Sequence, residues 1–365
     1  MKNISKKIAL AIISLSFLTS ASFAGEFAVT GGVKATYTIL SSGSTDAQQG
    51  KGKGLGISNE FTLGASGELD NGWTWKYAQD IDDATVQDDA SLVIGLGNLG
   101  TVGVFVSEGS LSTKYGFDAS AYGVGSDNGY GGGDTSTGSS ANTMQYGKNI
   151  SSYNNIQYHT PAGLLPFGIA AKVAVSPNAV VDANASSHAT GTDNDGAGDQ
   201  ANEYQITAAP IDGLSIGASY FNLDGESGIQ QGYESGSLTA KYAFGPVTVG
   251  YGITKVALNI GTTVSGSAVA HGYDNKAMSL GFKANDDLSF SYTVEKSDKL
   301  QKAKSTSGLV TTNTRSNVEM EIDTIQAAYT MGGMTMSLSL KDVDNDSYSA
   351  NKKVSETIFA VAMAF

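Results

Sequence analysis

The sequence contains no cysteine, a single arginine (Arg315) and only 5 prolines among its 365 residues. The lack of cysteine excludes disulfide frameworks, thiolate metal sites and cysteine nucleophiles. A single arginine argues against recognition of phosphates or carboxylates by paired guanidinium contacts. Acidic residues number 35 against 22 basic ones, and the resulting net charge of −13 disfavours nucleic acid as a partner.

Long apolar runs are also rare, and the one near the N-terminus is short. Its surroundings follow the order of a secretory signal peptide, with basic residues, an apolar core and small residues: Lys2, Lys6 and Lys7, Ile8–Leu18, and Ser22 and Ala24. We predict that residues 1–24 are a signal peptide cleaved after Ala24. The alternative is a membrane anchor, but the run falls short of the ~20 residues that a spanning helix needs. Since no later segment approaches that length, the chain could span a membrane only as a β-barrel.

Apolar and polar residues alternate from Phe27 onwards. Phe27, Val29 and Val33 fall on one side of the first segment, and Thr30 and Lys34 fall on the other. This period of two is typical of a β-strand with one apolar and one polar face. The apolar face would cover a core in a soluble sandwich and would meet lipid in a membrane barrel.

Segments of this kind recur to the end of the chain, joined alternately by tight turns and longer polar loops. We count about 16 of roughly 8–14 residues, an even number typical of bacterial barrels, whereas sandwich strands are nearer to ~5–6 residues. Many carry an aromatic residue near one end, as expected at membrane interfaces: Tyr37, Trp73, Tyr158, Tyr220, Tyr242, Tyr251, Tyr292 and Tyr329. The sequence thus predicts, for residues 25–365, an all-β fold: a transmembrane antiparallel up-and-down β-barrel.

One connection, residues 108–151, is much longer than the others and rich in Gly, Ser, Asp and Asn. Structureless loops longer than about 12–15 residues are uncommon and are usually functional or disordered. We expect this loop, which follows the fifth strand, to fold into the barrel and narrow it. Its charged residues are the candidate constriction residues. The anions are Glu108, Asp118, Asp127 and Asp134, and their local cationic partners are Lys114 and Lys148.

Charged residues within the strands should face the lumen. A lysine on the lipid face near the middle of the bilayer costs ~2–4 kcal/mol, so alternation with the apolar residues decides the side. The candidate wall residues are Lys34, Glu60, Lys76, Asp80 and Lys172.

The chain ends in a further alternating strand whose apolar positions are Phe359, Val361, Met363 and Phe365. This ending resembles the C-terminal strand of Gram-negative outer-membrane barrels. The resemblance implies a multi-pass barrel in the outer membrane, surrounded by its lipid, and recognition of Phe365 by the barrel-insertion machinery.

Strand number, loop order and size resemble the trimeric general porins. The segment Asn155–Pro161 after the long loop is similar to the segment of that family in which an Asn is followed by Tyr-x-x-Pro. The resemblance implies a homotrimer of 16-stranded barrels, each with an eyelet formed by an acidic loop and basic wall residues. The chain departs from the family in lacking an arginine cluster, because it reads Val106-Ser-Glu-Gly109 where an arginine is usual.

These observations favour a porin for passive diffusion of ions and small hydrophilic solutes, with neither an enzymatic step nor a required cofactor. The acidic loop predicts a weak preference for cations. Alternatives are a substrate-selective channel, for which the inward phase of Phe105 and Phe221 is a hint, and a plugged structural or adhesive barrel. An outer-membrane hydrolase is a more distant alternative, since no Ser-His pair is indicated.

Two acidic segments, Gly191–Asp199 and Asp342–Ser347, place carboxylates at alternate positions as calcium loops do. Neither has the distal glutamate of an EF-hand. We expect hydrated loops, with Ca²⁺ binding as the alternative.

Overall fold

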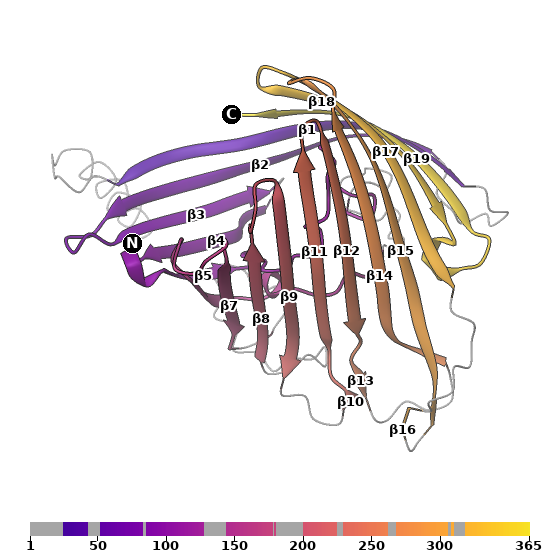
Figure 1. The fold of residues 1–365 in the computed structure, drawn as a ribbon, viewed down its shortest axis with the longest axis horizontal. Helices are drawn as coiled ribbons and strands as arrows, with labels where there is room; N and C mark the ends of the chain where they lie inside the picture. The colour runs from indigo at the N-terminus through magenta and orange to yellow at the C-terminus, as the bar shows by residue number, and fades with distance from the viewer. Residues whose placement is uncertain are drawn as a thin grey trace, which may run out of the picture.

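The computed structural model describes residues 25–42, 52–82, 85–127, 144–177, 179, 200–224, 229–261, 268–305, 308–309 and 318–365. Within these residues, sixteen antiparallel strands form one closed sheet (Figure 1). The strands of its first half are β1 (Glu26–Ser42), β2 (Gly52–Glu68), β3 (Thr74–Asp82), β4 (Thr85–Gly95), β5 (Thr101–Val106), β6 (Asn155–His159), β7 (Ala170–Ser176) and β8 (Gln200–Ala208). Those of the second half are β9 (Leu214–Asp224), β11 (Glu234–Phe244), β12 (Val247–Ala257), β14 (Ala268–Lys283), β15 (Leu288–Ser305), β17 (Glu319–Met331), β18 (Met334–Asp344) and β19 (Lys353–Ala364).

The barrel closes through β1, which pairs with β2 on one side and with β19 on the other. Every other barrel strand pairs with its neighbours in sequence, so the topology is up-and-down. Short strands outside the closed sheet are β10 (Ile229–Gln231), β13 (Ile260–Gly261) and β16 (Gly308–Leu309), of which the first two pair with each other. The predicted all-β barrel of about 16 strands is confirmed.

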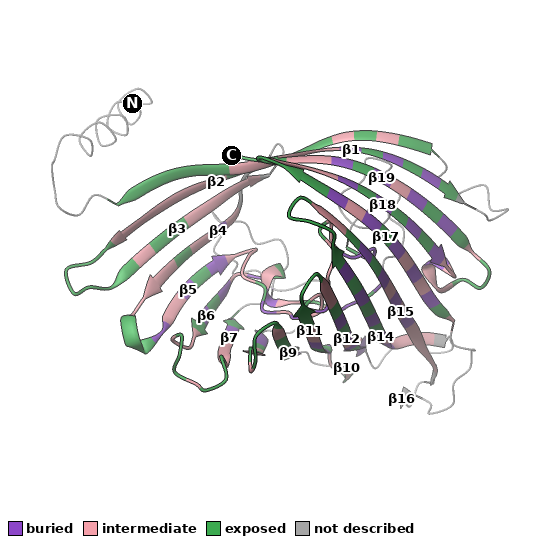
Figure 2. Cartoon of the chain, turned by 45° about the horizontal axis from the view of Figure 1, so that its top comes forward, coloured by how far each residue is buried: buried purple, intermediate pink, exposed green. Residues whose placement is uncertain are grey.

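Strand lengths vary more than the sequence suggested. We expected roughly 8–14 residues, whereas β6 has 5 residues and β15 has 18. The shortest strands of the closed sheet are β5, β6 and β7, and the long loop connects the first two (Figure 2). The chain leaves the sheet after Val106 and returns to it at Asn155, and described residues between them contact the inner wall.

The two faces of the sheet have opposite composition. Figure 2 shows buried residues alternating with more exposed ones along β17, β18 and β19. On β1 the buried Thr36 and Thr38 point inward, while Tyr37 and Ile39 are exposed on the outside. All eight strand-end aromatic residues predicted to lie at the interfaces are exposed as well. The apolar face is therefore the outer face of the barrel, whereas in a soluble sandwich the apolar face would cover an internal core.

Tight turns join the strands at the rim that also holds the C-terminal end of β19. At most of them a glycine adopts a positive φ, as such turns require, and examples are Gly72, Gly213, Gly245 and Gly332. Among the described residues, no helix is long and apolar enough to cross a membrane.

Candidate functional site

The long loop begins beside an acidic group on the wall. The side chain of Glu108 hydrogen-bonds to Asp80 on β3 and to Ser91 on β4, with Asp89 nearby. Burial, followed by the contact with Asp80, raises the pKa of Glu108 to about 7. Near neutral pH the Glu108 carboxyl can thus remain protonated and donate a hydrogen bond to Asp80.

A second wall carboxylate, Glu203 on β8, joins the two ends of the loop. It is 1% exposed and accepts hydrogen bonds from the backbone N–H groups of Leu111 (3.3 Å) and Ile150 (2.8 Å). These two residues lie 39 positions apart in the sequence, as their numbers show. Glu203 therefore holds the outgoing and returning arms of the loop together against β8.

The outgoing arm then crosses the inner wall. The N–H of Thr113 donates to Ser219 on β9 (3.0 Å), and the N–H of Ala119 donates to Ser279 on β14 (3.0 Å). Between these points the Lys241 ammonium on β11 donates to the carbonyl of Asp118 (3.0 Å). The arm thus contacts four successive strands of the inner wall, β9, β11, β12 and β14.

Glycines on the wall allow this close approach. A Cβ atom at Gly250 on β12 would lie 1.8 Å from the Phe117 carbonyl oxygen, and one at Gly281 on β14 would lie 2.7 Å from that of Ala119. Any side chain at these positions would require the loop backbone to move.

On the opposite side of the barrel interior, Glu295 on β15 binds both arms of the loop, as Glu203 does near the start of the loop. It is fully buried and accepts hydrogen bonds from the Ser126 N–H (2.9 Å), the Ser126 hydroxyl and the Tyr146 hydroxyl (2.8 Å). Since Ser126 and Tyr146 lie on opposite arms, this carboxylate again joins the two. Lys341 on β18 donates to the Gly125 carbonyl (3.0 Å) and forms a buried ion pair with Glu356 on β19 (2.8 Å).

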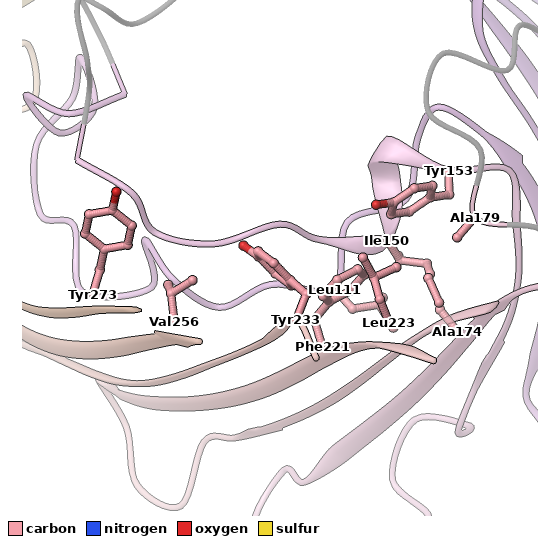
Figure 3. Packing of buried hydrophobic residues seen from close by; sticks show 11 residues of the cluster. Leu111, Ile150, Tyr153, Ala174, Ala179, Phe221, Leu223, Tyr233, Val256 and Tyr273 are labelled. Atoms are coloured by element: carbon pink, nitrogen blue, oxygen red, sulfur yellow. The ribbon is translucent and has the colours of Figure 1, made fainter. Parts of the chain in front are cut away.

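The returning arm lies over a buried apolar cluster (Figure 3). The rings of Tyr153 and Phe221 stack with centroids 6.2 Å apart, and Leu111 and Ile150 are almost completely buried beside them. The Tyr233 hydroxyl accepts a hydrogen bond from the Lys148 N–H (2.8 Å). Phe221 therefore packs beneath the loop.

Phe105 is likewise 9% exposed and lies against His159, with ring centroids 6.5 Å apart. The two inward phenylalanines that hinted at an apolar track for substrates are thus buried packing residues.

The wall residues singled out from the sequence all lie on the inner face. Lys34 shares the phase of the buried Thr36, and the register carries the same face to the neighbouring strands. Glu60 pairs across the strands with Gly32, and Lys76 pairs with Ser66. Asp80 pairs with Thr62, and Lys172 pairs with His159. The Lys34 ammonium also lies 5.4 Å from the ring centroid of Tyr122 in the loop.

The loop residues are distributed differently from one another. Asp118 is partly buried and accepts hydrogen bonds from the Ser120 N–H (2.8 Å) and hydroxyl, and burial raises its pKa. Asp127 is exposed. Asp134 lies outside the described residues. Glu108 stands apart from the other acidic loop residues, because the partners of its carboxyl group belong to β3 and β4.

Sequence reasoning missed the wall residues that hold the loop, namely Glu203, Lys241, Glu295, Lys341 and Glu356. The signal was clear only for Lys241, which lies between Ala240 and Tyr242. Glu203, Glu295 and Lys341 each have an apolar neighbour on one side only, and Glu356 lies between Ser355 and Thr357. Alternation could have placed Lys241 inside, but only the tertiary contacts show that these residues hold the loop.

The acidic segment 342–347 is paired with lysines. Asp344 contacts Lys353 at 2.7 Å, and Asp346 contacts Lys352 at 2.7 Å. Among the residues that the structure describes, no group of three or more histidines, aspartates or glutamates is placed to hold a metal ion. The segment 191–199 lies outside that description.

The last strand presents its apolar positions outward. Phe359, Met363 and Phe365 are 45%, 50% and 61% exposed, and Val361 shares their phase. The Phe365 ring lies 5.5 Å from that of Phe61, and the Phe365 backbone exchanges two hydrogen bonds with Gly31 (2.9 and 3.0 Å). These residues lie at the seam that closes the barrel.

No protein-family model matches the sequence, and no curated protein matches it. Solved structures do match over nearly the whole chain. An anion-selective porin from Comamonas acidovorans is 11% identical with a TM-score of 0.62, covering 93% of this chain and 100% of its own. OmpF of Salmonella typhi in complex with daunomycin is 13% identical with a TM-score of 0.60, covering 94% and 98%.

OmpT, an outer membrane protein of Vibrio cholerae, is 11% identical with a TM-score of 0.61, covering 95% of this chain and 99% of its own. At such low identity these matches establish the fold. The chain has the 16-stranded barrel fold of the general porins, which the sequence resemblance had predicted.

Proposed function

We propose that this chain is a porin of the Gram-negative outer membrane, forming a water-filled channel for passive diffusion of ions and small hydrophilic solutes. The observation that carries the proposal is a closed barrel whose polar inner face holds a long, hydrogen-bonded loop. Its apolar outer face suits lipid, since a closed barrel leaves no unpaired strand edge in the bilayer.

We further propose that the protein works as a homotrimer, without a cofactor or an enzymatic step. Residues 1–24 would act as the signal peptide, and the exposed C-terminal set of Phe359, Val361, Met363 and Phe365 would be read by the insertion machinery. One similar structure, OmpT of Vibrio cholerae, is described as a trimer form.

The ion preference should be weakly cationic. On the wall, Glu60 and Asp80 are accompanied by Lys34, Lys76 and Lys172. In the loop, the acidic Glu108, Asp118, Asp127 and Asp134 outnumber Lys114 and Lys148. A surplus of one sign in a narrow, low-dielectric lumen raises the local concentration of the opposite ion.

Single-channel recording in a planar bilayer tests the proposal. A porin gives stable conductance steps, grouped in threes if three barrels insert together. A barrel blocked by its loop gives no steady current even where the folded protein has inserted, and that result would favour the plugged or adhesive barrel.

A further inference from the structure

A cavity of about 540 Å³ lies between the outgoing arm of the loop and the wall. Loop residues 110 and 112–116 form one side, and β8, β9 and β11 form the other. Gly168 and Ala209, which belong to the tight turns, also line it, so the cavity lies toward the rim of short turns. Its volume falls within the ~300–1,000 Å³ typical of small-molecule sites.

The lining is rich in hydroxyl groups. Those side chains come from both the loop and the wall: Ser110, Ser112, Thr113, Tyr115, Thr207, Ser215 and Thr239. The hydroxyls of Thr113 and Thr239 bond within the protein, to Ser237 (2.8 Å) and to the Gly217 carbonyl (3.4 Å). Those of Ser110 and Ser112 accept from nearby backbone N–H groups and keep their own O–H to donate. Hydroxyls with a donor or acceptor to spare suit a solute that carries hydroxyls of its own. The remaining wall residues are mostly glycine and alanine, which leave room for it.

Among the described residues that line the cavity, Lys114 is the one charged residue, and none carries a carboxylate. Its ammonium lies 5.2 Å from the centroid of the Tyr115 ring and forms no ion pair with any residue that the structure describes. Glu203 and Asp127 act on it only at longer range, and burial lowers the pKa of Lys114. Glu203 is occupied by the loop N–H groups. A half-buried cation without a close counter-ion is a ready site for an anionic group.

We propose that this cavity is a binding site for small organic anions that combine one carboxylate with several hydroxyl groups, as hydroxy acids and sugar acids do. The inference rests on the proposed channel function, because such a solute would bind while it passes. Lys114 contacts the carboxylate, and the surrounding hydroxyls contact those of the solute. A single ammonium is a point charge suited to a monoanion, whereas a phosphate dianion would call for further cations, which this lining lacks.

Block of the single-channel current by four probes tests the site: gluconate, sorbitol, acetate and glucose 6-phosphate. Gluconate carries both groups, sorbitol lacks the carboxylate and acetate lacks the hydroxyls. We expect gluconate to block at a concentration about tenfold lower than either, because a hydrogen bond to a charged group is worth ~1.5–3 kcal/mol. Glucose 6-phosphate should block less well than gluconate. Equal block by gluconate and sorbitol, or stronger block by the phosphate, would overturn the assignment.

Two variants separate a local contact from the general charge of the lumen. Lys114→Gln keeps a polar side chain, one atom shorter, but removes the charge, and should raise the blocking concentration of gluconate about tenfold. Lys76→Gln removes one lumenal cation on β3, outside the cavity. It should change the blocking concentration of gluconate by no more than about twofold. If both variants shift the block equally, the cavity is no specific site.

Thr207→Val tests the hydroxyl contacts. It should weaken block by gluconate several-fold, by loss of about one hydrogen bond, and leave block by acetate unchanged. A channel that conducts but shows no preference for gluconate contradicts only this inference. A silent protein contradicts the proposed function itself.

Discussion

Buried carboxyl groups on the wall decide where the long loop lies. Glu203 and Glu295 each accept hydrogen bonds from both arms of the loop. Backbone N–H groups are strong donors, and a charged acceptor makes such bonds stronger than neutral ones. Single residues thus hold many loop residues in place.

Replacing Glu203 with alanine should loosen the loop. The variant leaves the N–H groups of Leu111 and Ile150 without their acceptor in a buried place, a loss on the order of 2–4 kcal/mol. We expect a lower melting temperature of the folded barrel and more frequent current flicker. Glu234→Ala, at an exposed position on the outer face, is the matched control. Unchanged flicker and stability in Glu203→Ala would show that Glu203 does not hold the loop.

The contact between Glu108 and Asp80 should make the channel sensitive to pH. The pKa of Glu108 is raised from 4.5 to about 7, so the protonated form is the one that the fold favours. The stabilisation is complete below the ordinary carboxyl pKa and is lost as the pH rises through about 7. Above that pH, repulsion between Glu108 and Asp80 loosens the start of the loop and adds a negative charge to the lumen.

Cation preference should consequently rise between about pH 6 and pH 8, with a midpoint near 7. Reversal potentials measured under a salt gradient at several pH values give this curve. Glu108→Gln should abolish the rise, since a neutral amide can still donate to Asp80 but cannot titrate. A variant with the same pH dependence as the natural protein would assign the titration to another group.

At the scale of elements, the loop and the wall are fitted to each other through glycine. In Gly250→Ala the new Cβ atom would lie only 1.8 Å from the Phe117 carbonyl oxygen, so the two would overlap. Overpacking of this kind costs ~1–3 kcal/mol, and the arm must move toward the lumen. We expect lower stability and a smaller single-channel conductance.

Gly236→Ala provides the control, because Gly236 on β11 faces outward and its added Cβ would lie 3.5 Å from the nearest atom. If both variants conduct like the natural protein, the loop arm does not rest on β12.

Much of this element structure could be predicted from the sequence, and the reason is the period of two. On β1 the alternation around Lys34 predicted both the strand and its inner face. The path of the loop could not be predicted. It depends on pairs such as Ile150 with Glu203 and Ser126 with Glu295, which are far apart in sequence and follow no local pattern.

At the scale of the whole molecule, the barrel separates two tasks. The outer face, with residues such as Phe359 and Phe365, suits lipid, and the inner face carries the charges and the loop. Because strand β1 pairs with both β2 and β19, the wall has no free edge. Selectivity can then be altered inside without disturbing the outer face.

The most direct test of this account is the single-channel conductance and reversal potential of the purified protein in a planar bilayer under a salt gradient. We predict stable steps that occur in threes and a reversal potential of the sign that indicates cation preference. Stable steps with an anion-directed potential would contradict the assigned charge balance of the lumen. A silent membrane that contains correctly inserted barrels would contradict the channel itself.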